Sequence, residues 1–118
     1  MSAGLTTHVL DISNGSPASG VRIELFRLQD AGAELLRTTY TNADGRVAEA
    51  ILSGEAFKTG VYELVFHVGD YFKQRGIDLA EPAFLDQVPI RFGISNREAH
   101  YHVPLLIAPW GYNTYRGS

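Results

Sequence analysis

Histidine is the residue type in this sequence best suited to proton transfer near neutral pH, because its ordinary pKa is about 6.5. His100 and His102 stand two residues apart in a β-prone run, so a strand there would point both imidazoles at one face. His8 lies in another β-prone run, where no local motif explains it. All three are candidates for acid–base chemistry, and the alternative for each is a surface or hydrogen-bonded structural histidine. His67, on the polar side of an alternating run, is interpreted as structural.

A guanidinium is the second candidate group. Arg46 directly follows Asp44-Gly45, a dipeptide that favours a tight turn. An arginine at such a place is most often simply solvated. It could instead stabilise negative charge that grows on a reacting oxygen.

The end of the sequence is unusual in composition. The segment 110–118 contains Trp110, Tyr112 and Tyr115, whereas chain ends are commonly polar and frayed. We therefore expect this segment to be packed, against a partner subunit.

Several chemistries are excluded by the motifs that the sequence lacks. It has no cysteine, no G-x-S-x-G nucleophile elbow, no phosphate loop, no H-E-x-x-H and no dinucleotide fingerprint. One metal alternative stays open, because His100-x-His102 with a distant histidine could form a three-histidine zinc site. No carboxylate or fourth ligand is marked out for it, so the prediction is a site without metal.

Length and charge bound the kind of protein. The 118 residues, 45% hydrophobic and 19% charged, predict one globular domain over 1–118. A formal charge of −3 with scattered basic residues argues against nucleic acid as a partner. No apolar run approaches the ~20 residues that cross a bilayer, and residues 1–5 do not resemble a secretory leader. We therefore expect no membrane partner and a cytoplasmic location.

Short β-prone runs separated by turn residues predict an all-β fold, a two-sheet antiparallel sandwich with one short helix. In the helix, Asp70 is the expected N-cap and Gly76 the residue that ends it. The expected strands are Thr6–Ile12, Val21–Leu28, Leu35–Asn42, Val47–Ile51, Val61–Val68, Val88–Ile94, His100–Ala108 and Trp110–Tyr115.

Four segments carry a resemblance to a known family. They are Leu5-Thr6-Thr7-His8-Val9-Leu10-Asp11, Thr41-Asn42-Ala43-Asp44-Gly45-Arg46, His100-Tyr101-His102-Val103-Pro104-Leu105-Leu106 and Tyr115-Arg116-Gly117-Ser118. They resemble the opening, the central turn and the two signature segments of the 5-hydroxyisourate hydrolases, which are transthyretin-like proteins. Departures from the family pattern are Ala108, Trp110, Asn113 and the segment 84–88, none of them among the matched chemical residues.

The resemblance implies an eight-stranded transthyretin-like sandwich assembled as a homotetramer, a dimer of dimers with active sites in a channel. It implies hydrolysis of 5-hydroxyisourate, an intermediate of urate breakdown, without a cofactor. The matching catalytic residues are His8, Arg46, His102 and Ser118, with Tyr115 closing the substrate pocket and His100 as a secondary substrate-binding candidate. Two other readings remain, a transthyretin-type carrier of small ligands and a sandwich that serves only as a structural or interaction module.

Overall fold

The computed structural model describes residues 3–118, which form eight strands, one α-helix and a single 3-10 turn. Met1 and Ser2, which entered the expectation about a leader, lie outside the described residues. The elements are β1 (Gly4–Asp11), β2 (Ser16–Pro17), β3 (Arg22–Gln29), β4 (Gly32–Tyr40), η1 (Gly54–Ala56), β5 (Gly60–His67), α1 (Val68–Gln74), β6 (Gln87–Ile94), β7 (His100–Ala108) and β8 (Gly111–Thr114).

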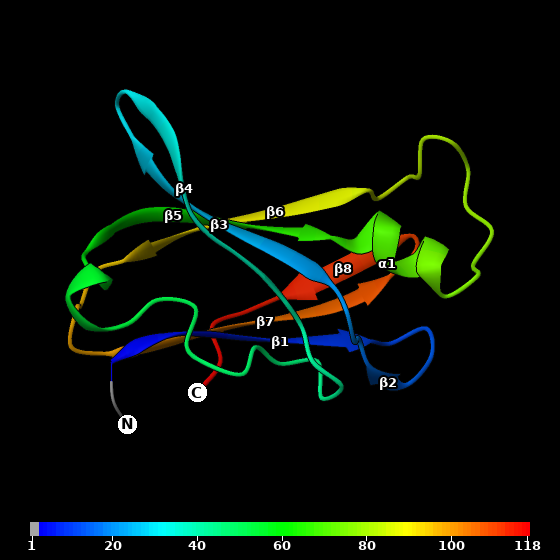
Figure 1. The fold of residues 1–118 in the computed structure, drawn as a ribbon, viewed down its shortest axis with the longest axis horizontal. Helices are drawn as coiled ribbons and strands as arrows, with labels where there is room; N and C mark the ends of the chain where they lie inside the picture. Colours follow the sequence, from blue (N-terminus) through cyan, green and yellow to red (C-terminus); the bar gives the residue numbers. More distant parts are fainter. Residues whose placement is uncertain (1–2) are drawn as a thin grey trace.

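The strands build two four-stranded sheets, ordered β2-β1-β7-β8 and β4-β3-β5-β6. Figure 1 shows the second sheet above the first, with α1 at one end of the sandwich. The predicted two-sheet sandwich with about eight strands and one short helix is confirmed. One pairing departs from the antiparallel expectation, because β1 and β7 run parallel. A parallel pair joins segments distant in sequence, so turn signals between consecutive strands could not reveal it.

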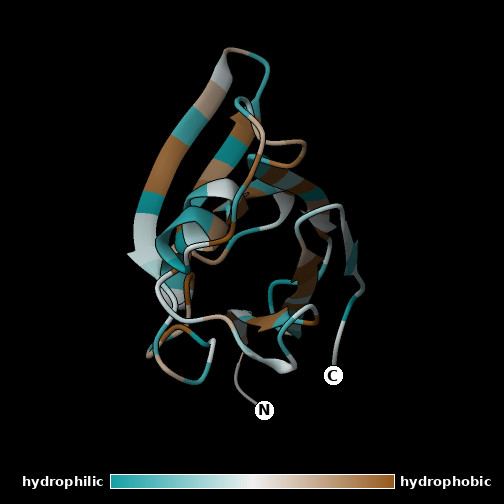
Figure 2. Cartoon of the chain, turned by 90° about the vertical axis from the view of Figure 1, so that its right-hand side faces the viewer, coloured by the Kyte–Doolittle hydropathy of each residue, from teal (hydrophilic) through white to brown (hydrophobic). Residues whose placement is uncertain are grey.

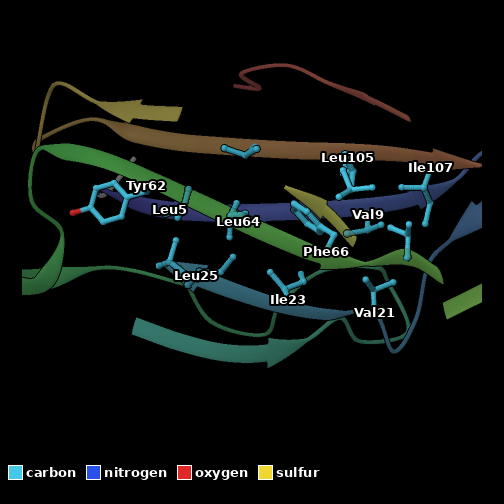
Figure 3. Packing of buried hydrophobic residues seen from close by; sticks show 14 of the residues in the cluster. Leu5, Val9, Val21, Ile23, Leu25, Tyr62, Leu64, Phe66, Leu105 and Ile107 are labelled. Carbon is cyan, nitrogen blue, oxygen red and sulfur yellow. The ribbon is translucent and has the colours of Figure 1, made fainter. Parts of the chain in front are cut away.

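Alternation along the strands fills the space between the sheets. In β5, Tyr62, Leu64 and Phe66 are fully buried, as their spacing predicted. Figure 3 shows these side chains beside residues of β3 in their own sheet and across from residues of β1 and β7 in the other. Viewed from the side in Figure 2, hydrophilic and hydrophobic residues alternate along the ribbons. Each strand therefore offers one face to the core and the other to the outside.

The predicted strand Val47–Ile51 is wrong. The residues that bridge to β1 flank this stretch, Arg46 pairing with His8 and Leu52 with Leu5. Between these two bridges, residues 47–51 form no β-bridge with β1. Residues 48–50 there are Ala-Glu-Ala, types that are depleted in strands. The segment thus follows one edge of β1 without extending the sheet.

The predicted N-cap of the helix is also wrong, while its end is confirmed. β5 runs directly into α1, so His67 stands at the N-cap and Asp70 lies inside the first turn. The first-turn N–H of Gly69 donates to the carbonyl oxygen of Asp86, which replaces a capping side chain. Gly76, at φ +81°, follows the last turn as expected. No helix within residues 3–118 is long and apolar enough to span a membrane.

His67 is structural, as interpreted from the sequence. Its Nε2 lies 2.6 Å from Oε1 of Glu24, and the side chain is buried on the sheet opposite to the one that carries the other three histidines.

A buried carboxylate anchors β1 to α1. Asp11, 1% exposed, accepts hydrogen bonds from the Ser13 backbone and hydroxyl, from the Tyr71 hydroxyl at 2.9 Å and from Arg75 at 3.3 Å. The network holds the end of the strand on which His8 lies, so it contributes to the position of that histidine.

We expect Asp11→Ala to lower the free energy of unfolding by roughly 3 kcal/mol. The substitution removes the carboxylate that accepts hydrogen bonds from Ser13, Tyr71 and Arg75. Chemical denaturation at one fixed protein concentration measures the change. Asp78→Ala, which removes an exposed carboxylate after α1, is the matched control and should change stability by less than about 0.5 kcal/mol. Equal stability of the two variants would contradict the anchoring role.

Candidate active site

The three candidate histidines lie on one face of the fold. β1 and β7 are neighbours, with Thr6 opposite His102 and Gly4 opposite His100. The core side of these strands is taken by Leu5, Val9, Tyr101 and Val103, so the residues between them point outward. We call this outer surface, which carries Thr6, His8, His100 and His102, the histidine face.

Thr6 joins two of the imidazoles. Its Oγ1 lies 2.8 Å from Nδ1 of His102 and 3.1 Å from Nε2 of His100. The two rings are nearly parallel, with centroids 6.4 Å apart and planes 13° from each other. A single hydroxyl is thus hydrogen bonded to both histidines.

Arg46 reaches the same region through the turn that precedes it. The Asn42 side chain accepts hydrogen bonds from the N–H groups of Asp44 and Arg46, and Gly45 adopts φ +75°. A Cβ at Gly45 would overlap the carbonyl oxygen of Val9, so this turn requires glycine. The turn therefore places the exposed residue Arg46 beside His8, with which it forms an isolated β-bridge.

His8 is oriented by the same turn. Its Nε2 donates to the carbonyl oxygen of Asp44 at 2.9 Å. Because a carbonyl oxygen only accepts, the proton of neutral His8 resides on Nε2, and Nδ1 keeps its lone pair. His8 can therefore accept a hydrogen bond or a proton at Nδ1.

The C-terminal segment packs beside His102. Gly117 donates its N–H to the carbonyl oxygen of His102 at 2.7 Å. Arg116 stacks over the Tyr101 ring at 4.1 Å and donates to the carbonyl oxygen of His100 at 3.2 Å. Figure 1 shows the chain end turning back toward β1 and β7. Ser118 follows directly and is exposed, and within residues 3–118 it makes no hydrogen bond with His102.

The His102 ring is held on two sides. Thr6 binds Nδ1, while Gly117 lies against Cδ2, where an added Cβ would come within 2.6 Å. The remaining nitrogen, Nε2, has no protein partner among the described residues. Burial lowers the pKa of His102, and the charges of Arg46, His100 and His8 lower it further. A neutral imidazole with an open nitrogen is suited to act as a base.

We expect Gly117→Ala to displace the His102 ring, because a Cβ at position 117 would stand 2.6 Å from Cδ2 of His102, too close for both to keep their places. Activity at this site should fall about 10-fold or more, in keeping with the sensitivity of a reacting geometry to displacements of about 1 Å. Gly111→Ala in β8, where an added Cβ meets no atom within 4 Å, is the matched control and should leave the rate unchanged. Unchanged turnover with unchanged histidine NMR shifts would show that the ring is not confined there.

Tyr115 belongs to a different hollow. A pocket of about 330 Å³ opens between the sheet edges at β6 and β8, and Tyr115 lines it together with Ile90, Phe92, Tyr101 and Arg116. Tyr115 is 59% exposed. Within one chain the structure therefore groups Tyr115 with this pocket, while His8, Arg46, His100 and His102 are grouped on the histidine face.

The described residues also bear on the zinc alternative. Across residues 3–118, no three side chains among His, Cys, Asp and Glu converge closely enough to hold a metal ion. His8 instead binds the turn at Asp44, and both nitrogens that approach Thr6 are engaged with its hydroxyl.

Sequence reasoning assigned no role to Thr6 or Gly117. Thr6 shares a face with His8 through the period of two, which was visible in the sequence. Its contact with His102 depends on the parallel pairing of β1 with β7, and that of Gly117 on the bridge from the chain end. Neither contact has a local signal.

Comparisons with known proteins agree with this architecture. A 5-hydroxyisourate hydrolase 2 from Rhizobium meliloti is 56% identical over 117 residues, covering 99% of this chain and 98% of the relative. The solved 5-hydroxyisourate hydrolase of Klebsiella pneumoniae superposes with a TM-score of 0.81 at 40% identity, covering 98% of this chain and 99% of the other. A sea bream transthyretin in complex with thyroxine gives 0.85 at 25% identity, covering 98% and 95%.

The family model described as the HIUase/Transthyretin family matches residues 5–117. That range contains β1, the Arg46 turn, β7 and the chain-end bridge to His102, which together build the histidine face. The chain therefore belongs to the HIUase/Transthyretin family.

Proposed function

We propose that this chain is a hydrolase, a single catalytic domain over residues 1–118 that opens the ring of 5-hydroxyisourate in urate breakdown. The product is 2-oxo-4-hydroxy-4-carboxy-5-ureidoimidazoline. The observation that carries the proposal is the convergence of His8, Arg46 and His102 from three distant segments on one outer face. Relatives at 56% and 40% identity bear the name 5-hydroxyisourate hydrolase, which supports the choice of substrate.

The reaction requires activation of water, which is a poor nucleophile at neutral pH. Nε2 of His102 takes a proton from water as the oxygen attacks the lactam carbonyl, and the imidazole becomes an imidazolium. Its lowered pKa keeps the ring neutral before the reaction. His8, with its lone pair on Nδ1, orients the water or the substrate. The ring C–N bond then breaks, and the nitrogen that leaves receives the proton held by the His102 imidazolium, which restores the neutral base.

Arg46 binds the electron-rich ring and stabilises the oxyanion formed by the attack. A preorganised donor of this kind typically contributes about 3 kcal/mol to the barrier reduction. Ser118 acts on His102 without a bond to either ring nitrogen, because its terminal carboxylate stabilises the imidazolium or its hydroxyl holds the water at Nε2, and His100 contributes to substrate binding. Tyr115 closes the pocket, which requires it to approach the histidine face of another copy, because within one chain it lines the hollow between β6 and β8.

The assembly is a homotetramer, a dimer of dimers. In one chain the histidine face is an open sheet surface, and an opposing copy would exclude the bulk water that weakens electrostatic catalysis. Large exposed apolar side chains, the kind found at interfaces, support association: Ile12, Phe84, Trp110, Tyr112 and Tyr115. Light scattering after size exclusion should give four times the 13.0 kDa chain mass. A monomer that is fully active would contradict the channel.

A carrier function is the principal rival, since a transthyretin with the same fold is known in complex with thyroxine. A carrier channel has no need of a base with an open nitrogen, so the arrangement around His102 favours hydrolysis. The expected cytoplasmic location stays a prediction, which fractionation of cells that produce the natural chain would test.

The decisive experiment generates 5-hydroxyisourate with uricase and follows its ultraviolet decay with and without the protein. We expect faster decay and a product of one handedness, because hydrolysis at the lactam carbonyl leaves the hydroxyl-bearing stereocentre set by uricase untouched. Thyroxine binding measured in parallel completes the test. Decay at the spontaneous rate together with tight thyroxine binding would replace the hydrolase by a carrier.

A further inference from the structure

The hydroxyl of Thr6 is shared by two imidazoles, and that sharing has a directional consequence. Thr6 can donate one hydrogen bond and accept two. Its Oγ1 lies 2.8 Å from Nδ1 of His102 and 3.1 Å from Nε2 of His100. When one ring nitrogen donates to the oxygen, the hydroxyl proton is available for the other ring nitrogen. The position of the proton on His102 is thus linked to that on His100.

The hydrogen bonds from His102 through Thr6 to His100 can run in two directions, and only one of them suits a base at Nε2 of His102. If Nδ1–H of His102 donates to Thr6 and the hydroxyl donates to Nε2 of His100, the lone pair of His102 lies on Nε2. In the opposite direction Nε2 of His102 carries the proton and cannot accept one. The first direction also suits the imidazolium, whose Nδ1–H still needs an acceptor after Nε2 has been protonated.

The charges around His102 favour the same direction. The groups that act on it are Arg46 from the central turn, His8 from β1 and His100 from its own strand. His100 is neutral when it accepts the Thr6 hydroxyl, so the lasting positive charge is that of Arg46, and a lone pair on the open nitrogen of His102 interacts better with that charge than an N–H does. The ring is flanked by Thr6 at Nδ1 and by the Gly117 backbone near Cδ2.

We propose, on the basis of the hydrolase function above, that Thr6 is a positioning residue that places the proton of His102 on Nδ1, with His100 accepting the Thr6 hydroxyl. Thr6 does not touch the reacting atoms. It acts by keeping Nε2 of His102 unprotonated and aimed away from the sheet. His100 thereby serves the reaction indirectly, as the acceptor that orients the hydroxyl.

The test compares Thr6→Val with Thr6→Ser. Valine keeps the shape and the β propensity of threonine but removes the hydroxyl, whereas serine keeps the hydroxyl. Loss of a partner that orients a functional histidine typically costs about 10–100-fold in activity. We expect a decrease of that size in kcat for Thr6→Val with little change in KM, and a rate close to the wild type for Thr6→Ser.

Nitrogen-15 NMR of labelled histidine supplies a readout that does not require turnover. In the wild type, His102 should show a protonated Nδ1 and an unprotonated Nε2 above its pKa, and in Thr6→Val this preference should be lost. Wild-type His102 with its proton on Nε2 would overturn the proposal, as would a hydrolytically active Thr6→Val with unchanged kcat. A wild type without hydrolysis would instead refute the proposed function, and the tautomer would still be measurable.

Discussion

Replacing His102 by alanine is expected to lower kcat for 5-hydroxyisourate by about 100-fold or more, the usual contribution of a positioned general base. The imidazole is held by Thr6 at 2.8 Å and by Gly117 on its other edge, while Nε2 is left for water. Its lowered pKa keeps it neutral at pH values where an ordinary histidine is partly charged. Removing the ring therefore removes the proton acceptor, and KM should change much less than kcat.

His102→Asn is the matched comparison, because its amide can still hydrogen bond with Thr6 but cannot act as a base. We expect it to be as inactive as His102→Ala, with thermal unfolding close to that of the wild type. Added imidazole should restore part of the rate of the alanine variant. Turnover of the asparagine variant near the wild-type rate would show that position 102 has a structural role only.

Arg46→Ala is expected to have the second large effect, a decrease of about 100- to 1,000-fold in kcat/KM, as for the loss of a preorganised donor to an oxyanion. The turn at Asn42 and Gly45 holds the backbone of this residue beside His8 whatever the side chain is, so the fold should be retained. Arg46→Lys should recover only part of the loss, because an ammonium lacks the planar fork of a guanidinium.

The same substitution should change the pH profile. The positive charge of Arg46 contributes to the lowered pKa of His102, so its removal should raise that pKa. The acidic limb of kcat/KM, which reports ionisation of the free enzyme, should lie below pH 6.5 in the wild type and move upward in Arg46→Ala. Arg22→Ala, on the opposite sheet, is the control and should alter neither rate nor profile. If the acidic limb of Arg46→Ala lay at the same pH as that of the wild type, the charge of Arg46 would have no effect on the pKa of the catalytic base.

Alternation and turn chemistry in the sequence were sufficient to predict much of the fold. The buried positions of β5 follow from the period of two, and β7 has the predicted bounds. The turn before Arg46 follows from Asp44-Gly45. The prediction of a strand over 47–51 was wrong because Val47 and Ile51, although strand-prone, flank Ala-Glu-Ala, and so short a segment has no period that distinguishes a bridged loop from a sheet strand.

For the site, the sequence determined which residue types are available and which side of its own strand each one occupies. It placed His100 and His102 on one face, and the family resemblance singled out His8 and Arg46. Which strands lie side by side, and in which direction, was decided only by the tertiary structure. The parallel pairing of β1 with β7 brings Thr6 to His102, and the bridges at Arg46 and Gly117 complete the surroundings. These contacts join residues from 15 positions apart (His102 and Gly117) to 96 positions apart (Thr6 and His102), and their formation depends on the packing of both sheets around one core, which no local pattern encodes.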